Sequence, residues 1–125
     1  MILDTDVLIW YMKGNKKAYS LVESLDGFSI SMVTYMELVQ EMRNKRELQE
    51  LRKAIRAWNA RILYITEEIS TRASLLVEKH FLSHSLFLAD AFIAATAVTY
   101  SDTLCTGNQK YFTMIKELDT AAFIP

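Results

Sequence analysis

Two aspartates follow the first apolar segment of the chain, at a place where carboxylates often bind metal ions. Met1 to Leu3 are apolar without alternation, and Asp4 and Asp6 come directly after them. Such a segment is typical of a strand that is covered on both faces and therefore central in a parallel sheet. Ligands of open α/β sheets bind beyond the carboxyl ends of the strands. We predict that Asp4 begins a metal site and that Asp6 is a secondary ligand or a helix cap.

Glu37 is the second candidate. It lies just inside a helix predicted for 33–43, which follows a strand predicted for 28–31. Thr34 and Glu37 have the spacing of a capping box, in which the glutamate bonds to the backbone N–H of the cap residue, so a structural role stays open. The helix nevertheless begins at the same edge of the sheet as Asp4, and this favours a shared site.

Asp90 is the most informative residue. It lies in the segment 86–98, which is apolar nearly all round and therefore predicts a buried helix. An unpaired ionised carboxylate in such a place costs several kcal/mol or becomes neutral. No Lys or Arg lies within one helical turn of Asp90. A bound divalent cation is the simplest compensation, and oxygen ligands suit Mg²⁺ or Mn²⁺.

Polar residues also follow a strand predicted for 103–106. Gly107 and Asn108 are typical turn residues and could simply cap the next segment. Alternatively, the hydroxyl of Thr106 or the amide of Asn108 could hold a metal-bound water, which makes both residues weaker candidates for the same site.

The two histidines, His80 and His84, have the i, i+4 spacing of paired metal ligands on a helix. The residues between them, 81–83, indicate a helix end and a loop, and no carboxylate stands at the HExxH spacing. We therefore expect both histidines to be surface or loop residues.

Strand and helix patterns alternate along the whole chain, which predicts parallel βαβ units and a three-layer α/β/α fold in a single domain, 1–125. The central parallel sheet should have four to five strands. Strands are expected at 1–4, 28–31, 61–65, 103–106 and 121–124, and helices at 7–12, 16–25, 33–43, 46–59, 66–80 and 85–100, with Thr66 as a cap and a short helical segment at 109–118.

Composition limits the possible functions. The formal net charge of −1 argues against binding nucleic acid through overall charge. Residues 41–61 are the exception, since seven basic and three acidic side chains give that segment a net charge of +4.

The single cysteine, Cys105, excludes an internal disulfide and fits a reducing compartment. The N-terminal apolar run is interrupted by acids, and 86–98 is shorter than the ~18 residues of a membrane span, so we expect a cytoplasmic protein.

Four motifs, taken in order, resemble those of PIN-domain ribonucleases, especially the small VapC-type toxins of bacterial and archaeal toxin–antitoxin systems. They are the segment 3–9, the start of the helix that contains Glu37, and the segments 88–97 and 104–112. The resemblance implies a PIN-like fold and an Mg²⁺- or Mn²⁺-dependent endoribonuclease, with Asp4, Glu37 and Asp90 at its centre. It also implies a homodimer bound by a cognate antitoxin that blocks the site. Family members often carry a further acid near the fourth motif, where this chain has Asn108 and Tyr111.

In such a site Asp4 and Asp90 would bind the cation directly, Glu37 would bind it or orient the attacking water, and Asn108 would complete the catalytic set. Two other functions stay open. A non-catalytic PIN-like binding module would keep the acids without turnover. A haloacid-dehalogenase-type phosphatase would use Asp4 and Asp6 as its DxD motif, although the downstream lysine and acidic pair of that family are missing.

Overall fold

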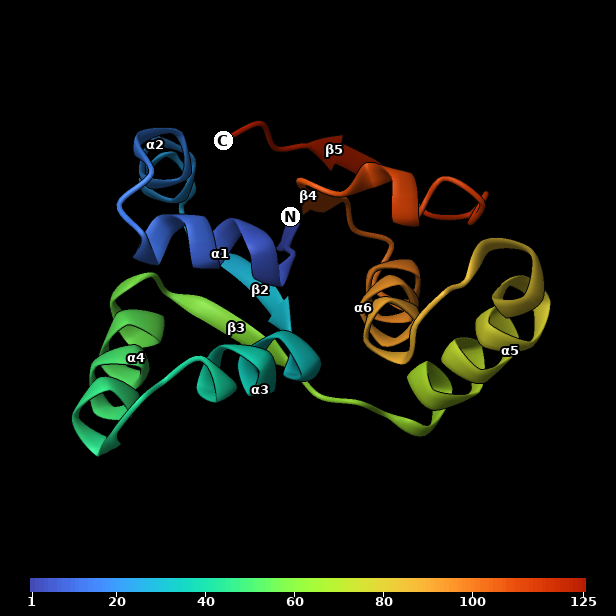
Figure 1. Ribbon diagram of the computed structural model, residues 1–125, viewed down its shortest axis with the longest axis horizontal. Coiled ribbons are helices and arrows are strands. Elements are labelled where there is room, and N and C mark those ends of the chain that lie inside the picture. The colour runs from blue at the N-terminus through green and yellow to red at the C-terminus, as the bar shows by residue number, and fades with distance from the viewer.

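The computed structural model describes residues 1–125, whose five strands form one parallel sheet (Figure 1). The strand order is β3-β2-β1-β4-β5, and every neighbouring pair is parallel. The first strand is central and completely buried, as its unbroken apolar pattern predicts. The strands are β1 (Ile2–Leu3), β2 (Phe28–Ser31), β3 (Ala60–Leu63), β4 (Leu104–Thr106) and β5 (Thr120–Ala122).

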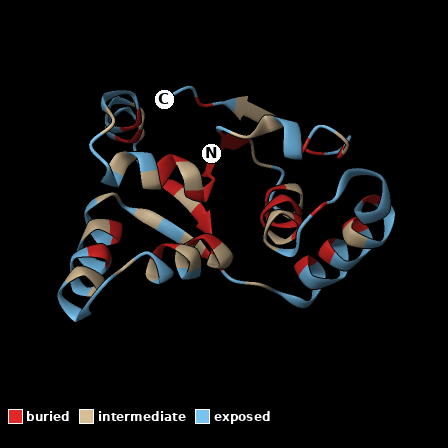
Figure 2. Cartoon of the chain, viewed as in Figure 1, coloured by how far each residue is buried: buried red, intermediate tan, exposed pale blue.

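Helices cover the sheet and bury two apolar clusters, which confirms the three-layer prediction. One cluster joins the sheet to α1–α4, and the other joins it to α5 and α6. Figure 2 shows buried residues gathered in the central strands and on the inner sides of these helices. The helices are α1 (Thr5–Met12), α2 (Lys16–Ser24), α3 (Met32–Gln40), α4 (Lys45–Ala57), α5 (Glu67–His84) and α6 (Leu88–Thr99), with a 3₁₀ helix η1 (Gln109–Tyr111).

Side-chain caps fix where several helices begin. The hydroxyl of Thr66 accepts a hydrogen bond from the N–H of Ile69 at the start of α5, as predicted. The alternative of a capping box formed by Thr34 and Glu37 is excluded. Ser31 is the N-cap of α3, because its hydroxyl accepts from the N–H of Val33, and Thr34 lies within the first turn of the helix and is fully buried. The side chain of Glu37 is therefore free for another role.

The end of α5 also differs from the prediction. The helix continues to His84, because its buried face, formed by Ile69, Ala73 and Leu76, extends by one further turn to His80. His80 is thus a buried helical residue, and its assignment to a surface or loop was wrong. The predicted helical segment 109–118 is shorter than expected, with only η1 in helical form. None of the helices combines the length and hydropathy that a membrane span requires.

Candidate active site

Asp4 stands at the carboxyl end of the central strand and is the N-cap of α1. Its side chain is only 7% exposed. Oδ1 accepts a hydrogen bond of 2.8 Å from the N–H of Thr5, and Oδ2 accepts one of 2.7 Å from the hydroxyl of Thr106. Burial raises the pKa of Asp4 to about 7 although the Thr106 hydroxyl opposes the shift, and the nearby charges of Asp6 and Asp90 add to the rise. In the metal-free protein, the protonated and ionised forms of this carboxyl group are therefore both populated near neutral pH.

Asp6 lies in the first turn of α1 and is held by the loop after β4. Its Oδ2 accepts hydrogen bonds from the N–H of Gly107 at 2.9 Å and from the amide of Asn108 at 3.0 Å. A Cβ at Gly107 would lie only 2.5 Å from this oxygen, so the contact requires glycine. The other oxygen, Oδ1, is buried without any hydrogen-bond partner. Burial is also the main reason why the pKa of Asp6 is raised.

Glu37 reaches the same edge of the sheet from α3. Its Oε1 accepts a hydrogen bond of 2.6 Å from the hydroxyl of Thr5, whose oxygen also lies 3.0 Å from the hydroxyl of Thr34. The backbone N–H of Thr5 is the donor to Asp4. One residue at the start of α1 thus positions two of the acids.

Asp90 comes from the first turn of α6, on the opposite side of the sheet edge. Its carboxyl group has no hydrogen-bond donor within the chain and is half-buried. Burial raises its pKa, and the charges of Glu37 and Asp6 raise it further. Asp4, Asp6, Glu37 and Asp90 therefore act on one another electrostatically, although they come from three different helices.

No basic side chain neutralises this cluster. The ion pairs of the molecule join Met1 to Asp102, Arg43 to Glu47 and Arg72 to Glu68, all away from the four acids. Unpaired carboxylates in a half-buried site are unfavourable unless a cation or protons compensate them.

The donor set fits a hard divalent cation. Its side chains offer oxygen ligands, and the unpartnered Oδ1 of Asp6 is one such atom. No three acidic side chains lie close enough together to surround a single ion. An ion at this site would therefore take one or two carboxylates directly and complete its shell with water, as hard divalent cations can.

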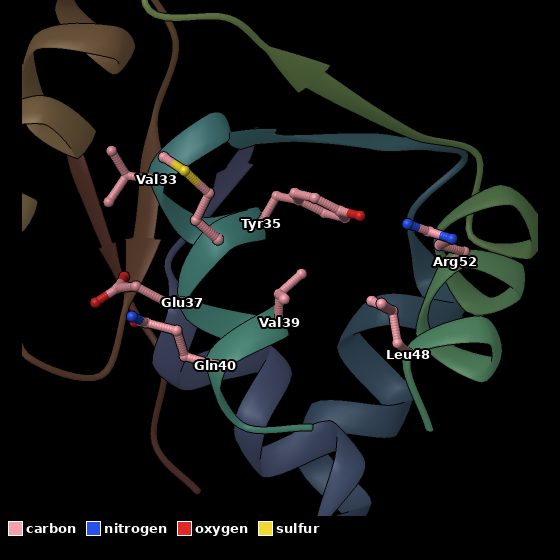
Figure 3. A pocket seen from close by; sticks show the side chains of 8 residues that line it. Val33, Tyr35, Glu37, Val39, Gln40, Leu48 and Arg52 are labelled. Carbon is pink, nitrogen blue, oxygen red and sulfur yellow. The ribbon is translucent and has the colours of Figure 1, made fainter. Parts of the chain in front are cut away.

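A groove of about 620 Å³ opens beside Glu37, between α3 and α4. Figure 3 shows Glu37 and Gln40 on one side of α3, whereas Tyr35 is turned towards Arg52 and Leu48 of α4. The groove thus connects an acid of the cluster with a basic side chain of the positively charged segment 41–61.

The structure places the predicted site residues at one edge of the sheet, and it adds Thr5 and Gly107. The predicted residues are Asp4, Asp6, Glu37, Asp90, Thr106 and Asn108. Thr5 and Gly107 were not predicted. The position of Thr5 between two aspartates is the signal that could have indicated its role. Asn108 contacts Asp6 and its side chain makes no capping hydrogen bond to η1, which excludes the alternative of a side-chain cap.

The family model of the PIN domain matches residues 1–117. The chain is 33% identical to "Ribonuclease VapC10" of Mycobacterium tuberculosis over an alignment that spans 100% of this chain and 95% of that protein. Among solved structures, it resembles a chain of a toxin–antitoxin complex from Klebsiella pneumoniae with a TM-score of 0.76 and 29% identity, covering 98% of both chains. It also resembles a chain of VapBC-1 from nontypeable Haemophilus influenzae with a TM-score of 0.80 and 24% identity, covering 97% of this chain and 96% of the other. The resemblance in the sequence motifs is thereby confirmed, and the chain belongs to the PIN domain family.

Proposed function

We propose that this protein is a divalent-metal-dependent endoribonuclease that hydrolyses RNA phosphodiester bonds and serves as the toxin of a toxin–antitoxin pair. The observation that carries the proposal is the group of four acids at the carboxyl edge of the sheet, none of which has a basic partner. The likeness to a protein named as a ribonuclease supports the same activity.

In this proposal Asp4 and Asp90 bind a Mg²⁺ or Mn²⁺ ion directly, and Glu37 binds it or orients the attacking water. Asp6 is a secondary ligand that Gly107 and Asn108 hold in place. When bound, the cation supplies positive charge that neutralises the phosphate and makes water a better nucleophile. The hydroxyls of Thr5 and Thr106 keep Glu37 and Asp4 in fixed orientations before substrate arrives.

The groove beside Glu37 is the proposed path of the RNA strand. Arg52 at its far end can contact a phosphate, and Tyr35 between them offers an aromatic face. The helix α4 adds the exposed Lys45, Arg46, Lys53 and Arg56, whereas the charge of Arg43 is already paired with Glu47. Binding through such contacts should weaken steeply with rising salt.

A cognate antitoxin is the proposed protein partner, since the chain resembles a component of a toxin–antitoxin complex. A second groove, of about 700 Å³, is lined by α1, α4 and the connection between α3 and α4, and it offers apolar surface that includes Ile9, Met42 and Trp58. We also propose a homodimer, whose interface would bury exposed apolar side chains such as Met36, Leu82 and Phe87. The free, buried Cys105 fits action in the cytoplasm.

The test is cleavage of a labelled RNA by the purified chain with Mg²⁺ or Mn²⁺ and with EDTA. We expect cleavage that needs the cation and is lost in Asp4→Asn and in Asp90→Asn. The matched control, Asp119→Asn, removes an exposed carboxylate elsewhere and should keep full activity. Metal and RNA binding without cleavage would favour the binding module, and a covalent aspartyl-phosphate would favour the phosphatase.

A further inference from the structure

His80 and His84 lie one helical turn apart at the end of α5, with their rings in contact. Because the helix continues through both residues, their i, i+4 spacing places them on one face. The ring centroids lie 5.8 Å apart, with an angle of 76° between the planes. Two imidazole nitrogens that share a tetrahedral Zn²⁺ at ~2.0–2.1 Å place their ring centroids roughly 5–6 Å apart. The pair therefore already has nearly the separation that a shared ion requires.

Ser83 lies against one ring nitrogen of His84 and leaves the other nitrogen for an ion. Its Oγ lies 2.6 Å from Nδ1 of His84 and donates a hydrogen bond of 3.4 Å to the backbone carbonyl of His80. In the tautomer with hydrogen on Nδ1, His84 donates to this Oγ, and Nε2 keeps the free lone pair that binds an ion. Ligating histidines commonly donate their second N–H in this way.

His80 has nitrogens that no protein group uses. Its side chain is only 7% exposed, yet neither ring nitrogen takes part in a hydrogen bond within the chain. Only Asp6 and Thr99 contain side-chain atoms that are both fully enclosed and unpartnered, so the nitrogens of His80 remain accessible to solvent and to an ion.

The surroundings admit a cation. The ring sits at the carboxyl end of an 18-residue helix, where the helix dipole favours positive charge. Glu117, from the segment after η1, acts on His80 with a negative charge, whereas Lys79 acts with a positive one. Burial lowers the pKa of His80, which keeps its ring neutral and its lone pair available.

We propose that His80 and His84 together bind a late first-row divalent ion such as Zn²⁺, with water in the remaining positions, at a site separate from the acidic cluster. Ser83 is a positioning residue of this site. The bound ion would tie the last turn of α5 together just before the turn that leads into α6.

The experiment is a Zn²⁺ titration of the full chain, followed by ¹H–¹⁵N correlation of the imidazole rings in excess Mg²⁺. The chain has two histidines, so every ring signal belongs to this pair. We expect both rings to shift together and to saturate at one Zn²⁺ per chain. Rings that do not respond to a tenfold excess of Zn²⁺, or that respond at different concentrations, would overturn the proposal.

Two variants at exposed positions sharpen the test without disturbing the core. His84→Gln should abolish the response of His80, and Ser83→Ala should weaken Zn²⁺ binding by about 10- to 100-fold. An unchanged response of His80 in His84→Gln would mean that the two rings do not share an ion.

Discussion

The hydroxyl of Thr106 donates a 2.7 Å hydrogen bond to Oδ2 of Asp4, joining residues 102 positions apart in the chain. This contact ties the ends of the neighbouring strands β4 and β1 together at the acidic cluster. With the N–H of Thr5 on Oδ1, both oxygens of Asp4 are fixed in place. The aspartate is therefore held by neutral donors, which orient its charge without cancelling it.

Replacing Thr106 by Val should remove this orientation while keeping the side-chain volume. Loss of a hydrogen bond to a charged group costs about 1.5–3 kcal/mol. We expect RNA cleavage to fall by about 10- to 100-fold. The pKa of Asp4 in the metal-free protein should rise further, which an NMR titration of the carboxyl group in EDTA can measure. Thr106→Ser, which keeps the hydroxyl, should stay near the wild-type rate, and an equal loss in both variants would refute this role.

The stability of the metal-free protein should fall as the pH rises. The pKa of Asp4 is 3.8 in an unfolded chain and about 7 in the folded protein. The folded state thus binds the proton more tightly, and its advantage is lost as the pH rises from about 4 to about 7. The slope should approach roughly 1.4 kcal/mol per pH unit. Urea unfolding in EDTA measures the slope, and Asp4→Asn should reduce it to the part that Asp6 and Asp90 contribute, since their pKa values are also raised. An undiminished slope would assign the effect to other groups.

Gly107→Ala should displace Asp6. The added Cβ would meet Oδ2 of Asp6 at 2.5 Å, and the backbone of Gly107 is not in the left-handed region, so this clash is the main penalty. We expect weaker metal binding and a loss of stability of about 1–3 kcal/mol. In the Asp6→Ala variant the added Cβ no longer meets a carboxylate oxygen, so Gly107→Ala should lower the free energy of unfolding much less. A double-mutant cycle gives the interaction energy between the two residues. If the losses of unfolding free energy in the two single variants simply add up in the double variant, the two residues do not interact.

Asp90→Asn should stabilise the metal-free protein and abolish cleavage. Burial and the charges of Glu37 and Asp6 all disfavour the ionised form of Asp90. A neutral amide removes this repulsion, and a gain of ~1 kcal/mol raises the Tm of a chain of this size by about 3–6 °C. Calorimetry in EDTA tests the shift against Asp119→Asn, which should leave the Tm unchanged. A lower Tm in Asp90→Asn would show that the carboxylate supports the fold.

The sequence predicted the sheet and the acidic edge well because both depend on local patterns. Unbroken apolar residues marked β1 as central. Asp4 and Glu37 lie at one edge because α1 and α3 each follow a parallel strand, and Asp90 joins them from the first turn of α6. The apolar run around Asp90 indicated a buried carboxylate before any partner was known.

Other features depend on contacts that no local pattern encodes. Thr5 reaches Glu37 across 32 positions, and Gly107 reaches Asp6 across 101. The extension of α5 to His84 was not predicted, because the last turn adds only exposed residues after His80 and so continues no apolar pattern in the sequence. Likewise, Ser31 displaced Thr34 as the cap because α3 begins immediately after β2.

The most direct measurement is the anomalous difference density of a crystal soaked in Mn²⁺. Our account predicts a peak within coordination distance of Asp4 and Asp90 that disappears in crystals of Asp90→Asn. A map without a peak near any of the four acids, from a crystal that holds Mn²⁺ elsewhere, would contradict the metal site and the cleavage mechanism that depends on it.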